Sequence, residues 1–363
     1  MTLRVKPGTE WASVYSQARM LAPEAFEPDR LNNLIAGQWQ SLGTTGVHAN
    51  PVDQSPIPGP PRIDQTAAAS AVASAAQQHH AWASVDLDER KSRVATALEG
   101  LREGRDTIAL LLAWEIGKPW RLACADVDRC VDGVEWYLTQ IERQLEGRHP
   151  LPGPISNIAS WNYPLSVLVH AELVQMLAGN AAIAKTPSQG GFHALTLAHA
   201  YLARAGLPAT LVSGVGAELS DALVSSPELG AFAFVGGRSN GRATLERLGN
   251  FDRRHILEQE GLNAWGVWNF SDWDGFAQHV RKGFEYAKQR CTAYPRYVIQ
   301  RQLFPKFLEM YLPIVESLRF GHPLAVAADN DTFPDLLFGP LIHRTKAQEL
   351  RNQFDEARSE EHT

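Results

Sequence analysis

The sequence is poor in cysteine and has no long apolar run. Only Cys124, Cys130 and Cys291 occur in its 363 residues, an odd number that does not make a disulfide framework. No apolar run is long enough to cross a membrane, and the amino terminus MTLRVKPGTEWAS lacks the apolar core of a signal peptide. We therefore expect no membrane association and a cytoplasmic location, and interpret each cysteine as a packing or a reactive residue.

The sequence also lacks an excess of basic residues and a metal-ligand motif. Lys and Arg number 34 against 40 Asp and Glu, a formal charge of −6, so nothing indicates nucleic-acid binding. Histidines occur close together only at His79 with His80 and at His193 with His199. Neither pair is joined by a Cys or carboxylate at ligand spacing. We expect a solvated pair and a helix-surface pair, no metal, and small molecules or proteins as partners.

What the sequence does contain is typical of a folded chain. It is 44% apolar and 20% charged, which excludes disorder by composition, and its length suggests about two domains. One short exception is the stretch at 50–62, NPVDQSPIPGPPR, whose prolines cannot continue a helix or a central strand. This stretch must be a loop.

The apolar pattern divides the chain into three parts. Residues 66–145 repeat apolar residues at spacings of three and four, which predicts helices, and the three prolines of 146–154 end that block. Short apolar runs then alternate with amphipathic ones, which predicts a parallel sheet wrapped by helices, a doubly wound unit. The predicted strands are 155–159, 181–184, 210–212 and 231–235, and the predicted helices are 165–177, 191–205, 217–225 and 240–248.

A second alternation begins near residue 254. It predicts strands at 256–257, 265–268 and 297–300 and helices at 272–289, 303–318 and 342–363. We therefore expect an α/β protein with a domain boundary near residue 253. Residues 1–252 would hold a helical segment and a doubly wound, Rossmann-like domain, and residues 253–363 a second α/β domain.

Cys291 is the candidate nucleophile. It lies in KQRCTAYPRYVIQ, between a predicted helix and a strand, with Lys288, Arg290 and Arg296 close in sequence. Cationic neighbours favour the thiolate, which is the nucleophilic form. The alternative is a buried small apolar residue, the more common role of a lone cysteine.

Three polar residues at the predicted strand ends are further candidates. Glu258 ends a strand and has the chemistry of a general base, with Glu260 as a rival on the same strand face. Asn162 follows an apolar strand, where it can donate to an oxyanion or cap a helix. Lys185 ends a strand where ligands usually bind, although by itself it is more typical of a solvated lysine.

Taken together, these segments resemble the aldehyde dehydrogenase superfamily. ASWNYPL is similar to that family's PWNFPL, IAKTPSQG to its KPSE segment and FVGGRSNG to its FTGS turn. ILEQEGLN is similar to LELGGKSP, and KQRCTAYPRYVIQ to GQxCxxxxRxxV. NLIAGQW, NPVDQSPI and LAWEIGKP also resemble family segments, so the resemblance runs from about residue 30 to GPLIHR at 339–344.

The resemblance implies NAD(P)-dependent oxidation of an aldehyde to a carboxylic acid, with the cofactor domain in residues 1–252 and the catalytic domain in residues 253–363. Cys291 would attack the carbonyl to form a thiohemiacetal, with Asn162 and the Cys291 backbone N–H holding the oxyanion. Hydride would pass to the nicotinamide, and water activated by Glu258 would hydrolyse the resulting thioester. Family positions for the cofactor correspond to Lys185 at the adenosine ribose, Gly236 and Gly237 near the pyrophosphate, and Trp161 along the cleft.

The sequence departs from the family pattern in several places. Ser188 stands where NAD-selective members usually carry a glutamate that binds the ribose hydroxyls, so we expect NADP to be accepted at least as well as NAD. Glu260, Gly261 and Leu262 replace the usual Gly-Gly-Lys. The stretch 146–154 is shorter than in members with an oligomerisation hairpin there, which predicts a reduced or altered oligomer.

The carboxy terminus is the largest departure. Members usually continue past the GPLI segment to a Glu-x-Phe-Gly-Pro motif and a terminal strand used in assembly. A second domain without these strands is expected to be incomplete and to expose apolar surface. Three interpretations stay open: an aldehyde dehydrogenase that forms homo-oligomers or is completed by another chain, a non-catalytic binding protein of the same fold, and cofactor-independent ester or thioester hydrolysis by Cys291.

Overall fold

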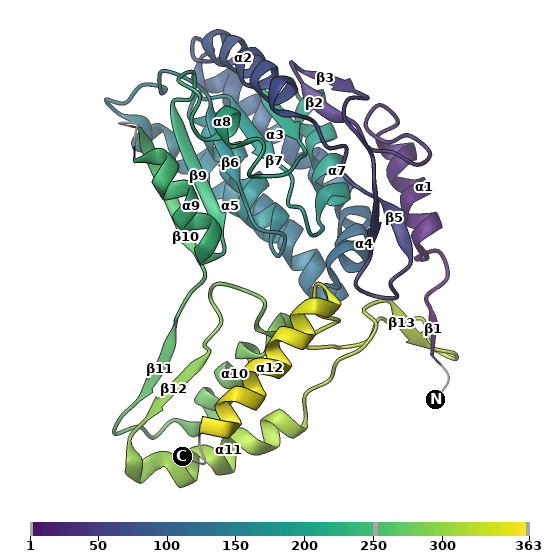
Figure 1. Cartoon of the computed structure of the whole chain (residues 1–363), viewed down its shortest axis with the longest axis vertical. Coiled ribbons are helices and arrows are strands. Elements are labelled where there is room, and N and C mark those ends of the chain that lie inside the picture. Colours follow the sequence, from purple (N-terminus) through teal and green to yellow (C-terminus); the bar gives the residue numbers. More distant parts are fainter. Residues whose placement is uncertain (1–2, 250–252, 361–363) are drawn as a thin grey trace.

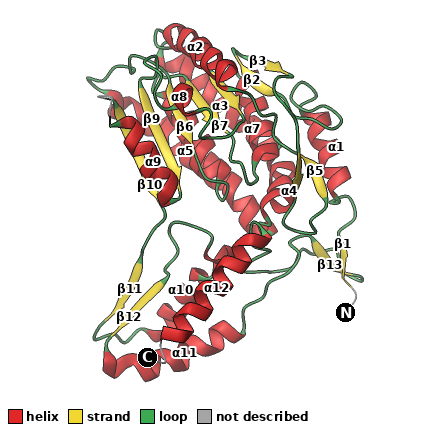
Figure 2. Ribbon diagram, in the orientation of Figure 1, coloured by secondary structure: helices red, strands yellow, loops and turns green. Residues whose placement is uncertain are grey.

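The computed structural model describes residues 3–249 and 253–360, and Figure 1 shows them as two lobes. The larger lobe holds the amino-terminal part of the chain through β10, and the smaller one holds β11 to α12. Figure 2 shows helices on both faces of the sheet in the larger lobe. The described residues thus have the mixed α/β architecture that the sequence predicts.

The larger lobe is built around a seven-stranded sheet with the order β10-β9-β6-β7-β8-β2-β3. From β6 the chain adds strands on one side as far as β8, then returns to add β9 and β10 on the other. The order therefore reverses between β6 and β9, where open parallel sheets bind ligands at their carboxyl edge. Five strands are parallel: β6 (Ile155–Ile158), β7 (Ala182–Lys185), β8 (Ala209–Val212), β9 (Ala231–Gly236) and β10 (Arg254–Gln259).

A hairpin that the apolar pattern did not predict completes this sheet. Strands β2 (Asn33–Ile35) and β3 (Gln38–Gln40) pair antiparallel, and β2 pairs antiparallel with β8. The two residues of the turn, Ala36 and Gly37, have φ of 54° and 72°, as a tight hairpin turn of this hand requires. Strands of three residues are too short to show a period of two in the sequence.

Alternate residues of the central strands face opposite helical layers. Ala182 and Ala184 of β7 lie in the main core with α3 to α7, whereas Ile183 lies in a second core with α2 and α8. This is the alternation that a two-sided parallel sheet requires. The helices of the larger lobe are α1 (Trp11–Leu21), α2 (Gln65–Trp82), α3 (Leu87–Glu103), α4 (Arg105–Ile116), α5 (Trp120–Leu145), η1 (Pro164–Val169), α6 (His170–Leu177), α7 (Phe192–Arg204), α8 (Ser220–Leu223) and α9 (Arg238–Leu248).

The helix ends follow from ordinary capping. Asp64 accepts a hydrogen bond from Ala67 N at 2.8 Å at the start of α2, and Asp86 accepts one from Glu89 N at 2.8 Å at the start of α3. Gly117 ends α4 in the left-handed conformation. The predicted helical block at 66–145 is confirmed. The predicted helix at 217–225 is reduced to the single turn of α8, because Pro227 and the turn before β9 follow it directly.

The expected boundary between residues 252 and 253 lies at the edge of 250–252, which the structure does not describe. The strand that follows, β10, was assigned to the second domain, but it pairs in parallel with β9 through Glu258 opposite Val235. It is the edge strand of the large sheet. Pairing between strands separated by a helix leaves no local signal, so the apolar pattern alone placed this strand in the wrong unit.

The smaller lobe is a short parallel pair covered by two helices. β11 (Ala264–Val267) pairs with β12 (Arg296–Ile299), and α10 (Trp273–Gly283) packs against α11 (Phe304–Glu316). Trp265, Phe276 and Phe307 belong to the aromatic core between them. The remaining elements are η3 (Arg301–Leu303), α12 (Arg344–Glu360), the pair β1 (Leu3–Val5) with β13 (Ala325–Ala327), and the pair β4 (Val47–Ala49) with β5 (Pro56–Pro58). The prediction of a loop at 50–62 is wrong for β5, because prolines can stand in a strand that pairs on one side only.

The helix predicted at 272–289 ends early. After α10 the chain forms the short η2 turn (Glu285–Lys288), in which Tyr286, Ala287 and Lys288 all have positive φ, between 51° and 58°. This conformation is costly for residues other than glycine. Tertiary bonds hold it: Tyr286 is fully buried, its hydroxyl donates to Ile116 O and its N–H donates to Leu337 O.

The histidine predictions are wrong in their burial. His79, His193 and His199 are all buried, at 4%, 0% and 0% exposure. His79 bridges Leu151 O and Ala181 N, His193 bonds to Glu115, and His199 bonds to Glu172. Burial with these side-chain and backbone contacts makes them packing residues, although His193 Nε2 has no hydrogen-bond partner among the described residues. Among the described residues no group of three or more His, Cys, Asp or Glu has the arrangement of a metal site.

Candidate active site

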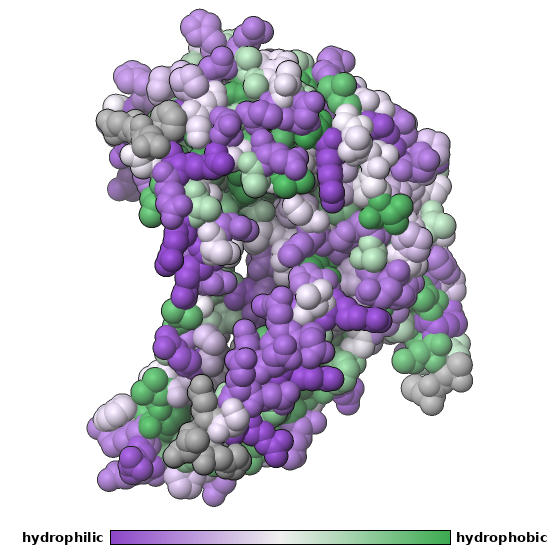
Figure 3. Space-filling view, viewed as in Figure 1, coloured by the Kyte–Doolittle hydropathy of each residue, from purple (hydrophilic) through white to green (hydrophobic). Residues whose placement is uncertain are grey.

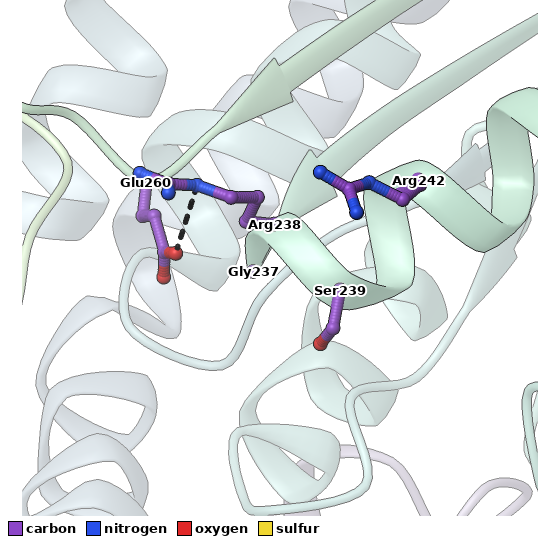
Figure 4. Close-up of a pocket in the computed structure, with 5 residues that line it drawn as sticks. All are labelled: Gly237, Arg238, Ser239, Arg242 and Glu260. Atoms are coloured by element: carbon purple, nitrogen blue, oxygen red, sulfur yellow. Dashed lines mark ion pairs between the residues drawn. The ribbon is translucent and has the colours of Figure 1, made fainter.

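The turn between β9 and α9 forms a pocket at the carboxyl edge of the sheet. The cavity, of about 480 Å³, is lined by Gly237, Arg238, Ser239, Arg242 and Glu260. Figure 4 shows both arginines rising from the first turns of α9, with Arg238 extended towards Glu260. Arg238 and Glu260 form an ion pair at 3.8 Å. Free N–H groups at a helix start, beside two guanidinium groups, suit an anion.

The predicted glycines occupy this turn for different reasons. A Cβ on Gly236 would lie 2.6 Å from the Phe234 ring, so packing requires glycine there. Gly237 precedes α9, no side chain caps that helix, and a Cβ on Gly237 would meet nothing closer than Glu260 at 3.9 Å. The open N-terminus therefore fits the pyrophosphate of a dinucleotide, whereas the carboxylate of Glu260 opposes it.

A second cavity, of about 190 Å³, lies at the ends of β7 and β8. Its lining includes Ser188, which is exposed. Lys185 beside it is buried rather than solvated as expected, and its ammonium donates to Thr186 O at 2.7 Å. Burial, together with the charge of Arg62, lowers the pKa of Lys185 to about 8. The lining residues are Pro60, Arg62, Thr186, Pro187, Ser188, Gly214 and Val215.

Cys291 is exposed, unlike Cys124 and Cys130, which are buried. The alternative of a buried apolar cysteine is therefore wrong for Cys291. Its loop is fixed from the side of β10, because Asn263 donates to Cys291 O at 2.6 Å and to Ala293 O at 3.0 Å. The close approach of this strand end requires Gly261, since a Cβ there would lie 2.1 Å from Cys291 O. The thiol is thus presented on a braced loop.

Asn162 lies beside the cysteine loop. Its side-chain amide donates to Gln289 O at 2.8 Å, two residues before Cys291, and its side-chain oxygen accepts from Ser160 Oγ at 2.6 Å. It does not cap η1, which begins without a side-chain cap. Trp161 next to it packs edge-on against the Tyr286 ring, 5.9 Å between centroids. The two segments predicted to act together therefore meet in space.

Glu258, unlike Asn162, has no described neighbour that holds its side chain in place. It is exposed in β10, and its carboxylate has no hydrogen bond or ion pair with any residue in the described ranges. Glu260, its rival, is held by Arg238 instead. The structure joins the end of β10 to Cys291 through Gly261 and Asn263. Glu258 is the carboxylate without a partner on that strand.

The cations near Cys291 in sequence brace its loop. Lys288 donates to Tyr294 O at 3.0 Å, Arg290 to Lys282 O at 2.7 Å and Arg296 to Leu262 O at 2.7 Å. Each donates to a backbone carbonyl group, and Arg290 also forms an ion pair with Glu285 at 3.6 Å. Their role in the described geometry is to hold the loop, which the sequence interpretation did not anticipate.

Sequence reasoning also missed a buried ion pair behind Asn162. Lys118 and Asp126 are both 0% exposed and lie 2.9 Å apart. The Lys118 ammonium also donates to Asn162 O at 2.7 Å and lies 3.8 Å from the centre of the Tyr163 ring. Asp126 in turn accepts from Ser166 N at 2.9 Å. An aspartate within the buried stripe of an amphipathic helix was the one signal that could have found it.

No helix among the described residues is long and apolar enough to span a membrane.

The sequence of residues 39–363 matches the model of the aldehyde dehydrogenase family. Among curated proteins, a succinate semialdehyde dehydrogenase of Acinetobacter baylyi is 24% identical over 350 residues, covering 91% of this chain and 70% of that protein. A 1-pyrroline-5-carboxylate dehydrogenase of Halalkalibacterium halodurans is 26% identical over 322 residues, covering 82% and 61%.

Solved structures agree in fold. An NADP-dependent glyceraldehyde-3-phosphate dehydrogenase from Bacillus halodurans, complexed with NADP, has a TM-score of 0.79 at 24% identity, covering 89% of this chain and 71% of that one. A betaine aldehyde dehydrogenase from Staphylococcus aureus, in complex with NAD+, has a TM-score of 0.81 at 19% identity, covering 96% and 71%. The chain spans 61% to 70% of the length of the two curated relatives. With most of its length matched by the family model, the chain belongs to the aldehyde dehydrogenase family.

Proposed function

We propose that this chain oxidises an aldehyde to a carboxylic acid with NAD or NADP, using Cys291 as the nucleophile. The observation that carries the proposal is the hydrogen bond from the Asn162 amide to Gln289 O. This bond places the Asn162 amide, which is a neutral hydrogen-bond donor, at the loop that carries the exposed Cys291 thiol. Two pockets suited to a dinucleotide lie at the carboxyl edge of the sheet in the same lobe as Asn162.

The first step would be attack of the Cys291 sulfur on the carbonyl carbon, giving a thiohemiacetal. The carbonyl oxygen becomes an oxyanion and needs donors. The Asn162 amide has two N–H groups, and one of them is used by Gln289 O. The Cys291 N–H donates to no described residue. These two free donors would hold the oxyanion.

A bound NAD(P) would supply the hydride acceptor, so that the thiohemiacetal becomes a thioester on Cys291. Arg238, Arg242 and the start of α9 would hold the pyrophosphate, and Lys185 with Ser188 would contact the adenosine ribose. Gly236 supports this turn by its packing, and Trp161 would line the cleft through its contact with Tyr286.

Glu258 would then activate the water that hydrolyses the thioester. Its carboxylate is exposed and free of ion pairs with described residues, so it is available to accept a proton. A general base at this position favours an acid product over transfer to coenzyme A. The absence of a carboxylate at Ser188 favours acceptance of NADP as well as NAD.

The smaller lobe supports a proposal about partners. Trp268, Val298 and Leu312 are 65%, 53% and 51% exposed, and β11 and β12 pair only with each other among the described strands. Figure 3 shows a small group of hydrophobic side chains, among hydrophilic ones, at the outer end of this lobe. We propose that another polypeptide surface covers them, in a homo-oligomer or a complex with a complementing chain.

The decisive experiment is formation of reduced nicotinamide by the purified 363-residue chain. Aliphatic and aromatic aldehydes would be tested with NAD and with NADP. Cys291→Ala should abolish turnover, and labelling by iodoacetamide should disappear at that residue. Cys124→Ala is the matched control, because it removes a buried thiol outside the site, and should retain activity. Equal turnover in Cys291→Ala, or none in a folded wild type that binds nucleotide, would overturn the proposal.

A further inference from the structure

The Lys118 ammonium group connects Asn162 to the helix behind it. Lys118 is 0% exposed, and its Nζ donates to Asn162 O at 2.7 Å and to Asp126 Oδ2 at 2.9 Å. The same Nζ lies 3.8 Å from the centre of the Tyr163 ring, where a cation–π contact is favourable. A fully buried ammonium group is costly unless it is paired and hydrogen-bonded. These contacts therefore hold Lys118, and with it the backbone of Asn162, in one place.

The carboxylate of Asp126 holds the helix that begins just after Asn162. Its Oδ1 accepts from Ser166 N at 2.9 Å and also from the Ser166 hydroxyl group. Ser166 is the third residue of η1, and Tyr163, which precedes that helix, supplies no side-chain cap. A carboxylate at the first turn of a helix gives a free N–H group its acceptor and favours the positive end of the helix. Asp126 thus fixes the start of η1 from α5.

The Asn162 side chain is held from the opposite direction. Its Oδ1 accepts from Ser160 Oγ at 2.6 Å, and its Nδ2 donates to Gln289 O at 2.8 Å. Because Nδ2 carries two N–H groups, the one that remains has a defined direction. A donor stabilises an oxyanion best when it is in place before the charge forms, and a displacement of about 1 Å can cost roughly 100-fold in rate.

We propose that Lys118 and Asp126 are positioning residues, which set the rate at which Cys291 attacks a carbonyl group by placing the Asn162 side chain. This inference rests on the proposed function. Both side chains are 0% exposed, and Lys118 reaches Asn162 through the main-chain oxygen. The two opposite charges cancel, so the pair acts through geometry and adds no net charge to the oxyanion. A purely structural pair would instead have the same effect with or without the Asn162 side chain.

The test compares two reactions of the Cys291 thiol in the purified full chain without cofactor. With p-nitrophenyl acetate the sulfur attacks the ester carbonyl carbon, a tetrahedral oxyanion forms, and p-nitrophenolate leaves and is measured by its absorbance. With iodoacetamide the same sulfur displaces iodide, and no oxyanion forms. Only acylation therefore needs the Asn162 donor. Cys124 and Cys130 are buried, so the exposed Cys291 is the thiol that both reagents reach.

Lys118→Met should lower the maximal rate of acylation roughly tenfold or more, because the Asn162 donor loses its fixed position. The half-saturating ester concentration and the rate of alkylation should stay within about twofold of the wild type, since neither depends on the oxyanion. Asn162→Ala should lower the acylation rate by roughly 100-fold. Adding Lys118→Met to Asn162→Ala should slow it by less than about twofold more, because the side chain through which Lys118 acts is already gone.

Two further variants complete the experiment. Lys91→Met is the matched control: Lys91 pairs with Glu142 at 3.5 Å, about 24 Å along α5 from Asp126, and its loss should leave both reactions unchanged. Lys118→Met by itself leaves a buried carboxylate unpaired, which destabilises the fold. Lys118→Met/Asp126→Leu replaces both charges with apolar side chains, keeps the fold by circular dichroism, and should show the same slow acylation.

The outcomes separate this inference from the proposed function. Acylation at the wild-type rate in Lys118→Met/Asp126→Leu would overturn the inference and leave the proposed function intact. The same holds for an equal loss of alkylation, or for a slowing by Lys118→Met that is as large in Asn162→Ala as in the wild type. Acylation that Asn162→Ala does not slow, or that the folded wild type does not perform, would overturn the proposed function as well.

Discussion

Glu258 and Glu260 lie on the same face of one strand end and differ in their surroundings. Glu260 is paired with Arg238, and Glu258 has no partner among the described residues. The ion pair occupies the carboxylate of Glu260, whereas the carboxylate of Glu258 is free to contact a water molecule. The free carboxylate is therefore the better candidate for the general base, and the two residues form a matched pair for experiment.

Glu258→Gln should separate the two halves of the reaction. We expect a burst of about one reduced nicotinamide per chain, followed by turnover slowed by roughly 100-fold or more, since thioester hydrolysis loses its base. Rapid-mixing absorbance would measure the burst, and intact-mass spectrometry would detect the acyl group on Cys291. Glu260→Gln should keep steady turnover. Loss of turnover in Glu260→Gln with an unaffected Glu258→Gln would assign the base to the other carboxylate.

At the scale of elements, His79 connects three segments of the larger lobe. From α2, its Nε2 donates to Leu151 O at 2.8 Å, in the loop before β6, and its Nδ1 accepts from Ala181 N at 3.1 Å, just before β7. Only the neutral imidazole can make both bonds. Burial lowers the pKa of His79 below its ordinary value of 6.5, and the Leu151 bond offsets this only partly.

Because the pKa of His79 is lowered, we expect the folded chain to become less stable as the pH falls. Above about pH 6.5 the imidazole is neutral in both the folded and unfolded chain, and its contribution to stability is fully present. Below that pH the unfolded chain binds more protons, so the free energy of unfolding should fall as the pH decreases towards the folded pKa. Urea unfolding between about pH 7.5 and 5.5 would measure it.

The matched variants isolate His79 from the other histidines. His79→Gln removes the titration and should flatten the decrease in the free energy of unfolding between those pH values. It should also cost roughly 1–3 kcal/mol at pH 7.5, because Ala181 N loses its acceptor. His80→Gln changes the exposed neighbour and should follow the wild type. An unchanged pH slope in His79→Gln would show that His79 does not titrate in this range.

At the scale of the whole molecule, the two lobes differ in how well they bury apolar surface. The larger lobe has cores on both faces of its sheet, whereas α11 in the smaller lobe presents Leu312 and Val315 to solvent at 51% and 38% exposure. Figure 3 also shows the molecule hollowed on one side between the lobes. A surface of this kind on one lobe favours association through that lobe.

We therefore expect the chain to associate through α11. Light scattering should give a mass of two or more chains of 40.0 kDa each. Leu312→Asp should reduce this mass towards that of the single chain, because a charge would be buried at the contact. Met20→Asp is the control, since Met20 is 72% exposed on α1 in the larger lobe. A wild-type mass of 40.0 kDa at micromolar concentration would contradict the prediction.

A strand, helix or turn could be predicted from the sequence where the residues that determine it are close together in the chain. The parallel strands β6 to β9 and the helices between them could be predicted, because apolar runs, helical spacing and glycines at helix ends are read within a few residues. The β2–β3 hairpin, the membership of β10 and the early end of α10 could not. Each depends on a partner far away in the chain: Leu211 for β2, Val235 for β10 and Leu337 for the turn at Tyr286.

The candidate site also combines local features, which the sequence determined, with contacts that only the tertiary structure decided. By itself the sequence determined the family, through segments around Asn162, Lys185, Glu258 and Cys291, since short motifs keep their order and spacing whatever the chain around them does. Only the tertiary structure decided that Arg62 reaches the end of β8, that Lys118 and Asp126 support Asn162 from behind, and that Glu260 rather than Glu258 is paired. Charge pairing and burial are set by neighbours in space, and residues separated by tens of positions become neighbours only when the sheet and its helices are assembled.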